Sequence, residues 1–142
     1  MEIRALTPDY AVSPQIDPED LPDIKAAGFT VVIDNRPDGE IPPSHHADTM
    51  RVAVEGAGLT FIANPVIGGM MTMENVTAQA AAIAAAGGPV LAYCASGNRS
   101  SVVWALAHAG KMPTDDLIGI PARHGYQLEG LRGQLDAMAK NG

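Results

Sequence analysis

The chain has 142 residues, which is enough for one domain with its own core. A hydrophobic content of 46% predicts a globular protein, and an aromatic content of only 4% predicts a core of aliphatic side chains. The net charge of -7 argues against nucleic acid and anionic membranes as partners, because both bind positive surfaces. We therefore expect a single globular domain over residues 1–142.

The sequence also bears on the cellular compartment. No apolar run is long enough to span a bilayer, and the first residues do not have the apolar core of a signal peptide. Cys94 is the only cysteine, so the chain cannot form an internal disulfide and gives no sign of an oxidising compartment. These features predict a soluble cytoplasmic protein.

The first half of the chain alternates helical and strand patterns. A helix is expected to begin near Asp20, after an irregular turn that contains Pro18, and to end at Gly28. The β-branched run 29–35 predicts a buried strand, and 36–43 has loop chemistry. A helical pattern over 45–58 and a second strand over 59–66 follow.

The second half continues the alternation. Thr72 is placed to cap a helix over 73–86, and Gly87 and Gly88 end it. The apolar run 89–93 predicts a central parallel strand, and a helix over 99–109 follows a short loop. Two further helical stretches are expected near 114–124 and 129–140.

This alternation predicts an α/β fold with a parallel-rich central sheet that is flanked by helices on both faces. In such sheets the functional crevice lies at the carboxyl ends of the strands. The loop that contains Cys94 and the loop that begins at Arg36 both lie at that edge.

The stretch LAYCASGNRS, residues 91–100, carries the strongest chemical signal. A strand, a tight loop and a helix start together present N–H groups inward, and such a cradle favours a thiolate, the nucleophilic form of cysteine. We expect Cys94 to be the nucleophile, Arg99 to bind an oxyanion, and Ser100 to donate a hydrogen bond to the sulfur or to the leaving group. The loop between them is expected to contact the substrate: Ala95, Ser96, Gly97 and Asn98. The alternative is a buried core thiol, which would need no Gly, Asn and Arg after it.

This loop resembles the active-site loops of cysteine-dependent protein phosphatases and of rhodanese-type sulfurtransferases. The segments 13–40 and 57–66 resemble the start of the dual-specificity phosphatase fold, and the arrangement over residues 3–110 resembles the beta-lactamase-hydrolase-like, phosphatase-like family, which is also described as a sulfur transferase family. The resemblance implies a cysteine-phosphatase-like fold and covalent catalysis through Cys94. We expect no cofactor and no metal.

Two departures from the phosphatase pattern bear on the reaction. Phosphatases of this type have five residues between Cys and Arg, whereas four separate Cys94 from Arg99, as in rhodanese-type loops that hold a persulfide. The segment 64–75 also has no Asp to protonate a leaving oxygen, and Glu74 is typical of a helix start. We therefore predict sulfur transfer through a Cys94 persulfide, with a phosphatase as the alternative and an inactive binding module as the third. The expected partners are a small anionic, thiol or persulfide substrate, or a phosphoprotein.

Other residues leave two interpretations open. Arg36 either binds the substrate anion or forms a surface ion pair with Asp38 or Glu40. Arg123 and His124 either reach the site or serve a helix end. A structural interpretation is favoured for a few remaining residues. His45 and His46 are expected to be a solvated loop or helix start and not a metal pair. Core filling is expected of Met70, Met71 and Met73, and Trp104 is expected to be a core anchor.

Overall fold

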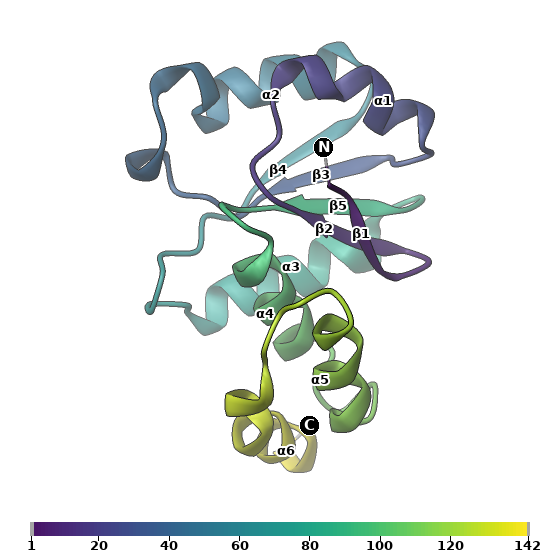
Figure 1. Cartoon of the computed structure of the whole chain (residues 1–142), viewed down its shortest axis with the longest axis vertical. Helices are drawn as coiled ribbons and strands as arrows, with labels where there is room; N and C mark the ends of the chain where they lie inside the picture. Colours follow the sequence, from purple (N-terminus) through teal and green to yellow (C-terminus); the bar gives the residue numbers. More distant parts are fainter. Residues whose placement is uncertain (1, 142) are drawn as a thin grey trace.

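The computed structural model describes residues 2–141 and contains a five-stranded sheet of order β1-β2-β5-β3-β4 (Figure 1). Strands β2, β5, β3 and β4 run parallel, and β1 pairs with β2 in the antiparallel direction. The strands are β1 Arg4–Thr7, β2 Tyr10–Ser13, β3 Val31–Asp34, β4 Thr60–Ala63 and β5 Val90–Tyr93.

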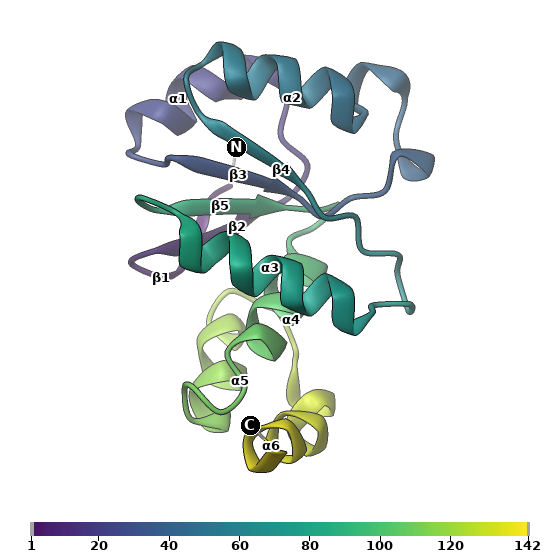
Figure 2. The ribbon, with the colours of Figure 1, turned by 180° about the vertical axis from the view of Figure 1, so that it is seen from behind.

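Helices cover both faces of the sheet (Figures 1 and 2). Helices α1 (Leu21–Ala26) and α2 (Ala47–Gly56) lie on one face, and α3 (Met73–Ala85) and α4 (Asn98–Ala107) lie on the other. Helices α5 (Thr114–Ala122) and α6 (Arg132–Asn141) form a further layer beyond α4, with which α5 is in contact. Short 3-10 helices span Pro18–Asp20, Asp38–Glu40, Pro43–His45 and Glu129–Leu131.

The central strand explains why both faces are covered. Val90 and Ala92 of β5 pack into the core beneath α3 and α4, whereas Leu91 and Tyr93 pack into the core beneath α1 and α2. Successive side chains of a strand point to opposite faces, so an uninterrupted apolar run requires burial on both sides. The predicted α/β class with a parallel-rich sheet is confirmed.

Most predicted elements are present, with shorter bounds. The helix predicted near Asp20 is a 3-10 turn followed by α1, which has Pro22 in its first turn, where a proline costs no hydrogen bond. The predicted Thr72 cap is confirmed, because its hydroxyl accepts a hydrogen bond from the amide of Asn75. The hairpin of β1 and β2 was not predicted, since its strands have four residues each and show no clear period.

The sheet brings three loops to one edge. Asp34 at the end of β3 is in register with Tyr93 of β5 and with Ala63 of β4. The segments that begin at Asn35, Asn64 and Cys94 therefore start side by side, as expected for the carboxyl ends of parallel strands. None of the helices within residues 2–141 has the length and apolar character needed to cross a membrane.

Candidate active site

The Cys94 loop forms the predicted strand-to-helix junction. Cys94 directly follows β5 and is buried, and α4 begins four residues later at Asn98. Gly97, the residue before α4, has a φ of 98° and donates its amide hydrogen to Cys94 Sγ at 3.1 Å. The sulfur thus lies beside a backbone N–H at the start of a ten-residue helix, which is a favourable environment for negative charge.

Other side chains hold this loop in shape. The Tyr126 hydroxyl donates to the carbonyl of Ser96 at 2.8 Å, and the Ser101 hydroxyl donates to the carbonyl of Gly97 at 2.8 Å. The Ser96 hydroxyl accepts from the amide of Asn98 at 3.2 Å, and the carbonyl of Ala95 accepts a longer bond from the amide of Gln15. Of the four predicted loop residues, Gly97 thus contacts the sulfur, and the role of Tyr126 in the loop was not foreseen.

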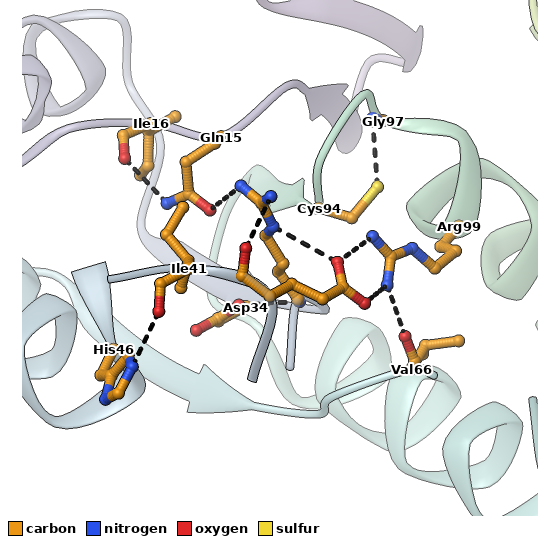
Figure 3. A network of polar contacts seen from close by, with 11 residues as sticks. Gln15, Ile16, Asp34, Ile41, His46, Val66, Cys94, Gly97 and Arg99 are labelled. Carbon is orange, nitrogen blue, oxygen red and sulfur yellow. Dashed lines mark hydrogen bonds and ion pairs between the residues drawn. The ribbon is translucent and has the colours of Figure 1, made fainter. Parts of the chain in front are cut away.

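Arg99 lies beside Cys94 with most of its donors engaged (Figure 3). Its Nη1 and Nη2 atoms donate to the two carboxylate oxygens of Glu40 at 2.7 Å each, and Nη1 also donates to the carbonyl of Val66 at 2.9 Å. A guanidinium has five N–H groups, so the N–H of Nε and the second N–H of Nη2 remain. These two lie on one edge and, within residues 2–141, donate to no oxygen or nitrogen acceptor, so Arg99 keeps the parallel fork that binds an oxyanion.

Glu40 also contacts Arg36, so one carboxylate joins two arginines. Arg36 Nε lies 3.4 Å from Glu40 Oε1, and Arg36 Nη2 donates to the carbonyl of Glu40 at 3.2 Å. The guanidinium of Arg99, with a smaller effect from Arg36, holds the pKa of Glu40 below its usual range. The structure shows Arg36 in the ion pair with Glu40 that the sequence left open, while its role toward a substrate stays a prediction.

Ser100 is buried and does not make the expected contact. Its hydroxyl donates to Oδ1 of Asn35 at 2.9 Å, and the described structure shows no hydrogen bond from it to the sulfur of Cys94. Donation from Ser100 to the sulfur is therefore not realised in this arrangement, and donation to a leaving group stays a prediction. The reason is its position in the first turn of α4, which directs the side chain inward, toward the polar group at the end of β3.

A hollow of about 250 Å³ opens next to Arg36. Its walls are mostly apolar and include Ala63, Pro65 and Ile67, and Asp34 lies in its lining. Burial raises the pKa of Asp34 from 3.8 to about 6, although this carboxylate accepts a hydrogen bond from the amide of Arg36. A second hollow of about 320 Å³, lined by Arg99 among others, shares Ile67 with the first.

The remaining candidates make no hydrogen bond to the sulfur within residues 2–141. His45 contacts Asp17 and His46 contacts the carbonyl of Ile41, so the two rings have different partners, and no group of three metal-ligating side chains occurs within residues 2–141. His124 contacts the carbonyl of Ala5, and Arg123 follows the end of α5. Trp104 is a core anchor, as predicted. The methionine prediction was wrong in part: only Met71 packs against the core, whereas Met70 and Met73 are exposed.

Sequence reasoning missed Glu40 as a partner of Arg99, and it missed Asp34 and Tyr126. The motif that contains Glu40 was visible, because RPDGE directly follows a strand that ends at the same sheet edge as Cys94. What the sequence did not show is that this glutamate, 59 residues away, binds the arginine of the Cys94 loop.

Comparison with known proteins defines the class first. The fold matches the core catalytic domain of a PP-IP phosphatase from S. cerevisiae with a TM-score of 0.68 at 11% identity, over 93% of this chain and 81% of that one. A candidate phosphatase from Neisseria meningitidis matches with a TM-score of 0.83 at 33% identity, over 96% and 98% of the two chains. The chain thus has a cysteine-phosphatase-like fold.

The family is equally clear. Residues 2–111 match the model of the beta-lactamase hydrolase-like protein, phosphatase-like domain, and the chain belongs to that family. A beta-lactamase hydrolase-like protein of Xylella fastidiosa is 32% identical over 130 residues, which are 90% of this chain but only 30% of the relative. The chain therefore spans less than a third of the curated relatives it matches. Both comparisons favour the phosphatase-type interpretation, which the sequence placed second, over sulfur transfer, which it placed first.

Proposed function

We propose that the protein is a cysteine-dependent phosphatase that hydrolyses phosphate esters through a Cys94 phosphoenzyme. The observation that supports this most is the Arg99 fork: two parallel N–H donors remain beside the sulfur after Glu40 and Val66 have taken the other three. A phosphoryl group offers the paired oxygens that such a fork binds. The family is described as a phosphatase-like domain and the Neisseria relative as a candidate phosphatase, and both descriptions support the proposal.

The reaction proceeds in two displacements. Cys94 Sγ attacks phosphorus and forms an S–P bond while the bond to the ester oxygen breaks, and the leaving group departs as an alkoxide or phenolate that takes a proton from water. Water then attacks phosphorus, the S–P bond breaks, and the thiolate and inorganic phosphate are released. During both steps the fork of Arg99 and the loop amides bind the equatorial oxygens, where charge is carried.

The choice of leaving group follows from the acids near the site. Glu40 is held ionised by its two arginines, so it has no proton to give at neutral pH. The loop over 64–72 contains no Asp or Glu. Without a general acid from Glu40 or from this loop, alkyl phosphates are expected to react more slowly than aryl phosphates by about two to four orders of magnitude, because a phenolate departs without a proton.

Sulfur transfer remains the second candidate because one observation favours it. Only four residues separate Cys94 from Arg99, the short spacing that resembles rhodanese-type loops. In this reaction Cys94 Sγ attacks the outer sulfur of thiosulfate, an S–S bond forms on the enzyme while the S–S bond of thiosulfate breaks, and sulfite leaves. The persulfide then passes its outer sulfur to an acceptor thiolate, and no proton donor is needed because thiolates leave readily.

One preparation decides between the candidates. It is incubated with an aryl phosphate, a phosphoserine peptide, thiosulfate and glutathione persulfide, and turnover and the mass of Cys94 peptides are followed, with Cys94→Ser as the control. Aryl phosphate turnover with a phosphorylated Cys94 peptide supports the proposal. Turnover of sulfur donors with one added sulfur on Cys94 and no phosphate release overturns it in favour of sulfur transfer. No turnover together with slow alkylation of the thiol overturns both and identifies a binding module.

A further inference from the structure

A closed set of buried hydrogen bonds lies behind the Cys94 loop. We name it the polar ring, and it consists of Tyr10, Asn35, Gln79 and Ser100. All four side chains are essentially inaccessible to solvent. A buried polar group without a partner is costly, so a ring of this kind forms only when every member is satisfied.

Gln79 is the hub of the polar ring and comes from the otherwise alanine-rich helix α3. Its Oε1 accepts hydrogen bonds from Asn35 Nδ2 at 2.9 Å and from Asn64 Nδ2 at 2.8 Å. Its Nε2 donates to Asn35 Oδ1 and to the Tyr10 hydroxyl, both at 3.1 Å. All four hydrogen-bonding positions of the amide are used, which fixes its orientation because a flipped amide would face two other donors.

The two partners of the Gln79 donor group meet again at Ser100. The Ser100 hydroxyl donates to Asn35 Oδ1 at 2.9 Å, and the Ser100 carbonyl accepts from the Tyr10 hydroxyl at 2.8 Å. Gln79 therefore holds both groups that hold Ser100, although it does not contact Ser100 itself. Because Ser100 follows Arg99 in the first turn of α4, fixing Ser100 at its hydroxyl and its carbonyl fixes the rotation of that turn.

Asn35 extends the same control to the other side of the loop. Its backbone amide donates to the carbonyl of Tyr93, the residue before Cys94, at 2.8 Å. Its carbonyl accepts from the amide of Val66, whose own carbonyl binds Arg99. The polar ring thus contacts the backbone on both sides of the segment from Cys94 to Arg99.

We propose that Gln79 is a positioning residue, which through the polar ring sets the placement of the Arg99 fork relative to the Cys94 sulfur. This proposal deepens the proposed function, since it concerns the anion cradle of the same site. Gln79 touches neither the sulfur nor any substrate, so its loss is expected to weaken anion binding and not to remove the nucleophile. The class of anion need not be known, because inorganic phosphate and sulfate both fit a bidentate fork.

The test measures protection of Cys94 from iodoacetamide by inorganic phosphate and by sulfate, across pH, in the full chain. In Gln79→Met, which keeps the length and removes four hydrogen bonds, the phosphate concentration for half protection is expected to rise about 10-fold, the order of one misplaced charge-assisted hydrogen bond. Ile24→Ala is the matched control, because Ile24 is buried in the core on the opposite face of the sheet. It is expected to lower the melting temperature and leave protection unchanged.

A second pair of variants keeps the test decisive even where Gln79→Met does not fold. Tyr10→Phe removes one hydroxyl and so opens the ring at two bonds, and it is expected to weaken protection in the same direction. If the ring acts as a unit, Tyr10→Phe adds little to the effect of Gln79→Met, as expected for coupled sites. The proposal is overturned if phosphate protects both Gln79→Met and Tyr10→Phe as well as wild type. Where Gln79→Met is unfolded, wild-type protection of Tyr10→Phe alone overturns it. Full additivity of the two effects in the double variant also overturns it.

The readout separates this proposal from the proposed function. Alkylation and its protection by an anion do not require turnover of any substrate. If the wild-type protein releases no phosphate from esters while the Gln79 variants lose protection, the phosphatase proposal fails and the proposal for Gln79 stands. If the protein is an active phosphatase and the Gln79 variants are protected as well as wild type, the proposal for Gln79 fails and the phosphatase proposal stands.

Discussion

In the Cys94 loop the backbone conformation and Tyr126 leave no room for a side chain at position 97, so Gly97→Ala is the sharpest test of the geometry of this loop. Gly97 has a φ of 98°, a conformation that side chains disfavour. A Cβ there would overlap the Tyr126 hydroxyl and would lie 2.9 Å from Tyr126 Cζ. The tyrosine cannot simply retreat, because its hydroxyl donates to the carbonyl of Ser96 and accepts a hydrogen bond from Arg4.

The magnitude follows from these contacts. The backbone conformation costs about 1–2 kcal/mol for a residue with a Cβ. Displacing Tyr126 loses two hydrogen bonds worth about 0.5–1.5 kcal/mol each. The free energy of unfolding of Gly97→Ala is therefore expected to fall by about 2–5 kcal/mol, which lowers the melting temperature by about 6–20 °C in a chain of this size. Turnover is expected to fall at least about 10-fold, because the loop amides move relative to Arg99.

Thermal unfolding and aryl phosphate turnover measure the two effects, and the chain offers a matched control. Gly28 has a φ of 99°, and a Cβ added there would meet nothing within 4 Å, so Gly28→Ala reports the backbone cost alone and leaves turnover unchanged. The penalty of Gly97→Ala is also expected to be smaller in the Tyr126→Phe background, which lacks the overlapping hydroxyl. Equal losses of stability at the two glycines, or a penalty independent of Tyr126, would refute the reasoning.

Three further predictions concern single side chains. Cys94→Ser is expected to keep the melting temperature within a few degrees and to lose all turnover; retained activity would remove the covalent mechanism. Arg99→Ala is expected to lose more activity than Arg36→Ala, and Arg99→Lys is not expected to rescue it because lysine has no planar fork; comparable kcat/KM values for the two alanine variants would contradict this order. Burial raises the pKa of Asp34 from 3.8 to about 6, so the folded state binds more protons than the unfolded state between these values, and stability should fall as pH rises from 4 to 6. Asp34→Asn is expected to remove this fall and to be more stable at pH 7 by up to about 3 kcal/mol; parallel stability curves from pH 4 to 7 would show that Asp34 does not carry it.

The sequence was sufficient for the fold class and for the place of Cys94 between a central strand and a helix. Local patterns encode both: the apolar run 90–93 marks a central strand, and Cys94 followed by small residues marks a tight loop before a helix. Long-range partners left no such pattern. Tyr126 reaches the loop from 30 residues away and Glu40 reaches Arg99 across 59 residues, and either side chain alone is unremarkable in the sequence.

Ser100 shows the limit of local reasoning more clearly. A serine in the first helical turn after a nucleophile can donate either to the sulfur or to any acceptor behind the helix. The choice is made by Asn35 at the end of β3, whose Oδ1 is buried beside α4 and accepts the hydroxyl. The sequence contains Asn35 but does not reveal that its amide is held in place by Gln79.

The short loop favours sulfur transfer, whereas the ion pair of Glu40 with Arg99 favours phosphoryl transfer, and one substitution distinguishes the two. One residue fewer between Cys94 and Arg99 than in the phosphatase pattern implies a smaller anion cradle, yet Glu40 and Val66 hold the guanidinium so that one edge stays available. Phosphoryl transfer depends on this edge because charge develops on the equatorial oxygens, whereas sulfur transfer from a neutral alkyl persulfide develops no such charge. Glu40→Gln removes the ionic clamp but keeps the side-chain size. It is expected to lower kcat/KM for an aryl phosphate about 10-fold or more and to leave capture of sulfur from a neutral alkyl persulfide nearly unchanged, as followed by phosphate release and by the mass of the Cys94 peptide. Phosphate release that is indifferent to Glu40→Gln would mean that the Arg99 fork does not need its clamp, and the short loop would then be the better guide to the chemistry.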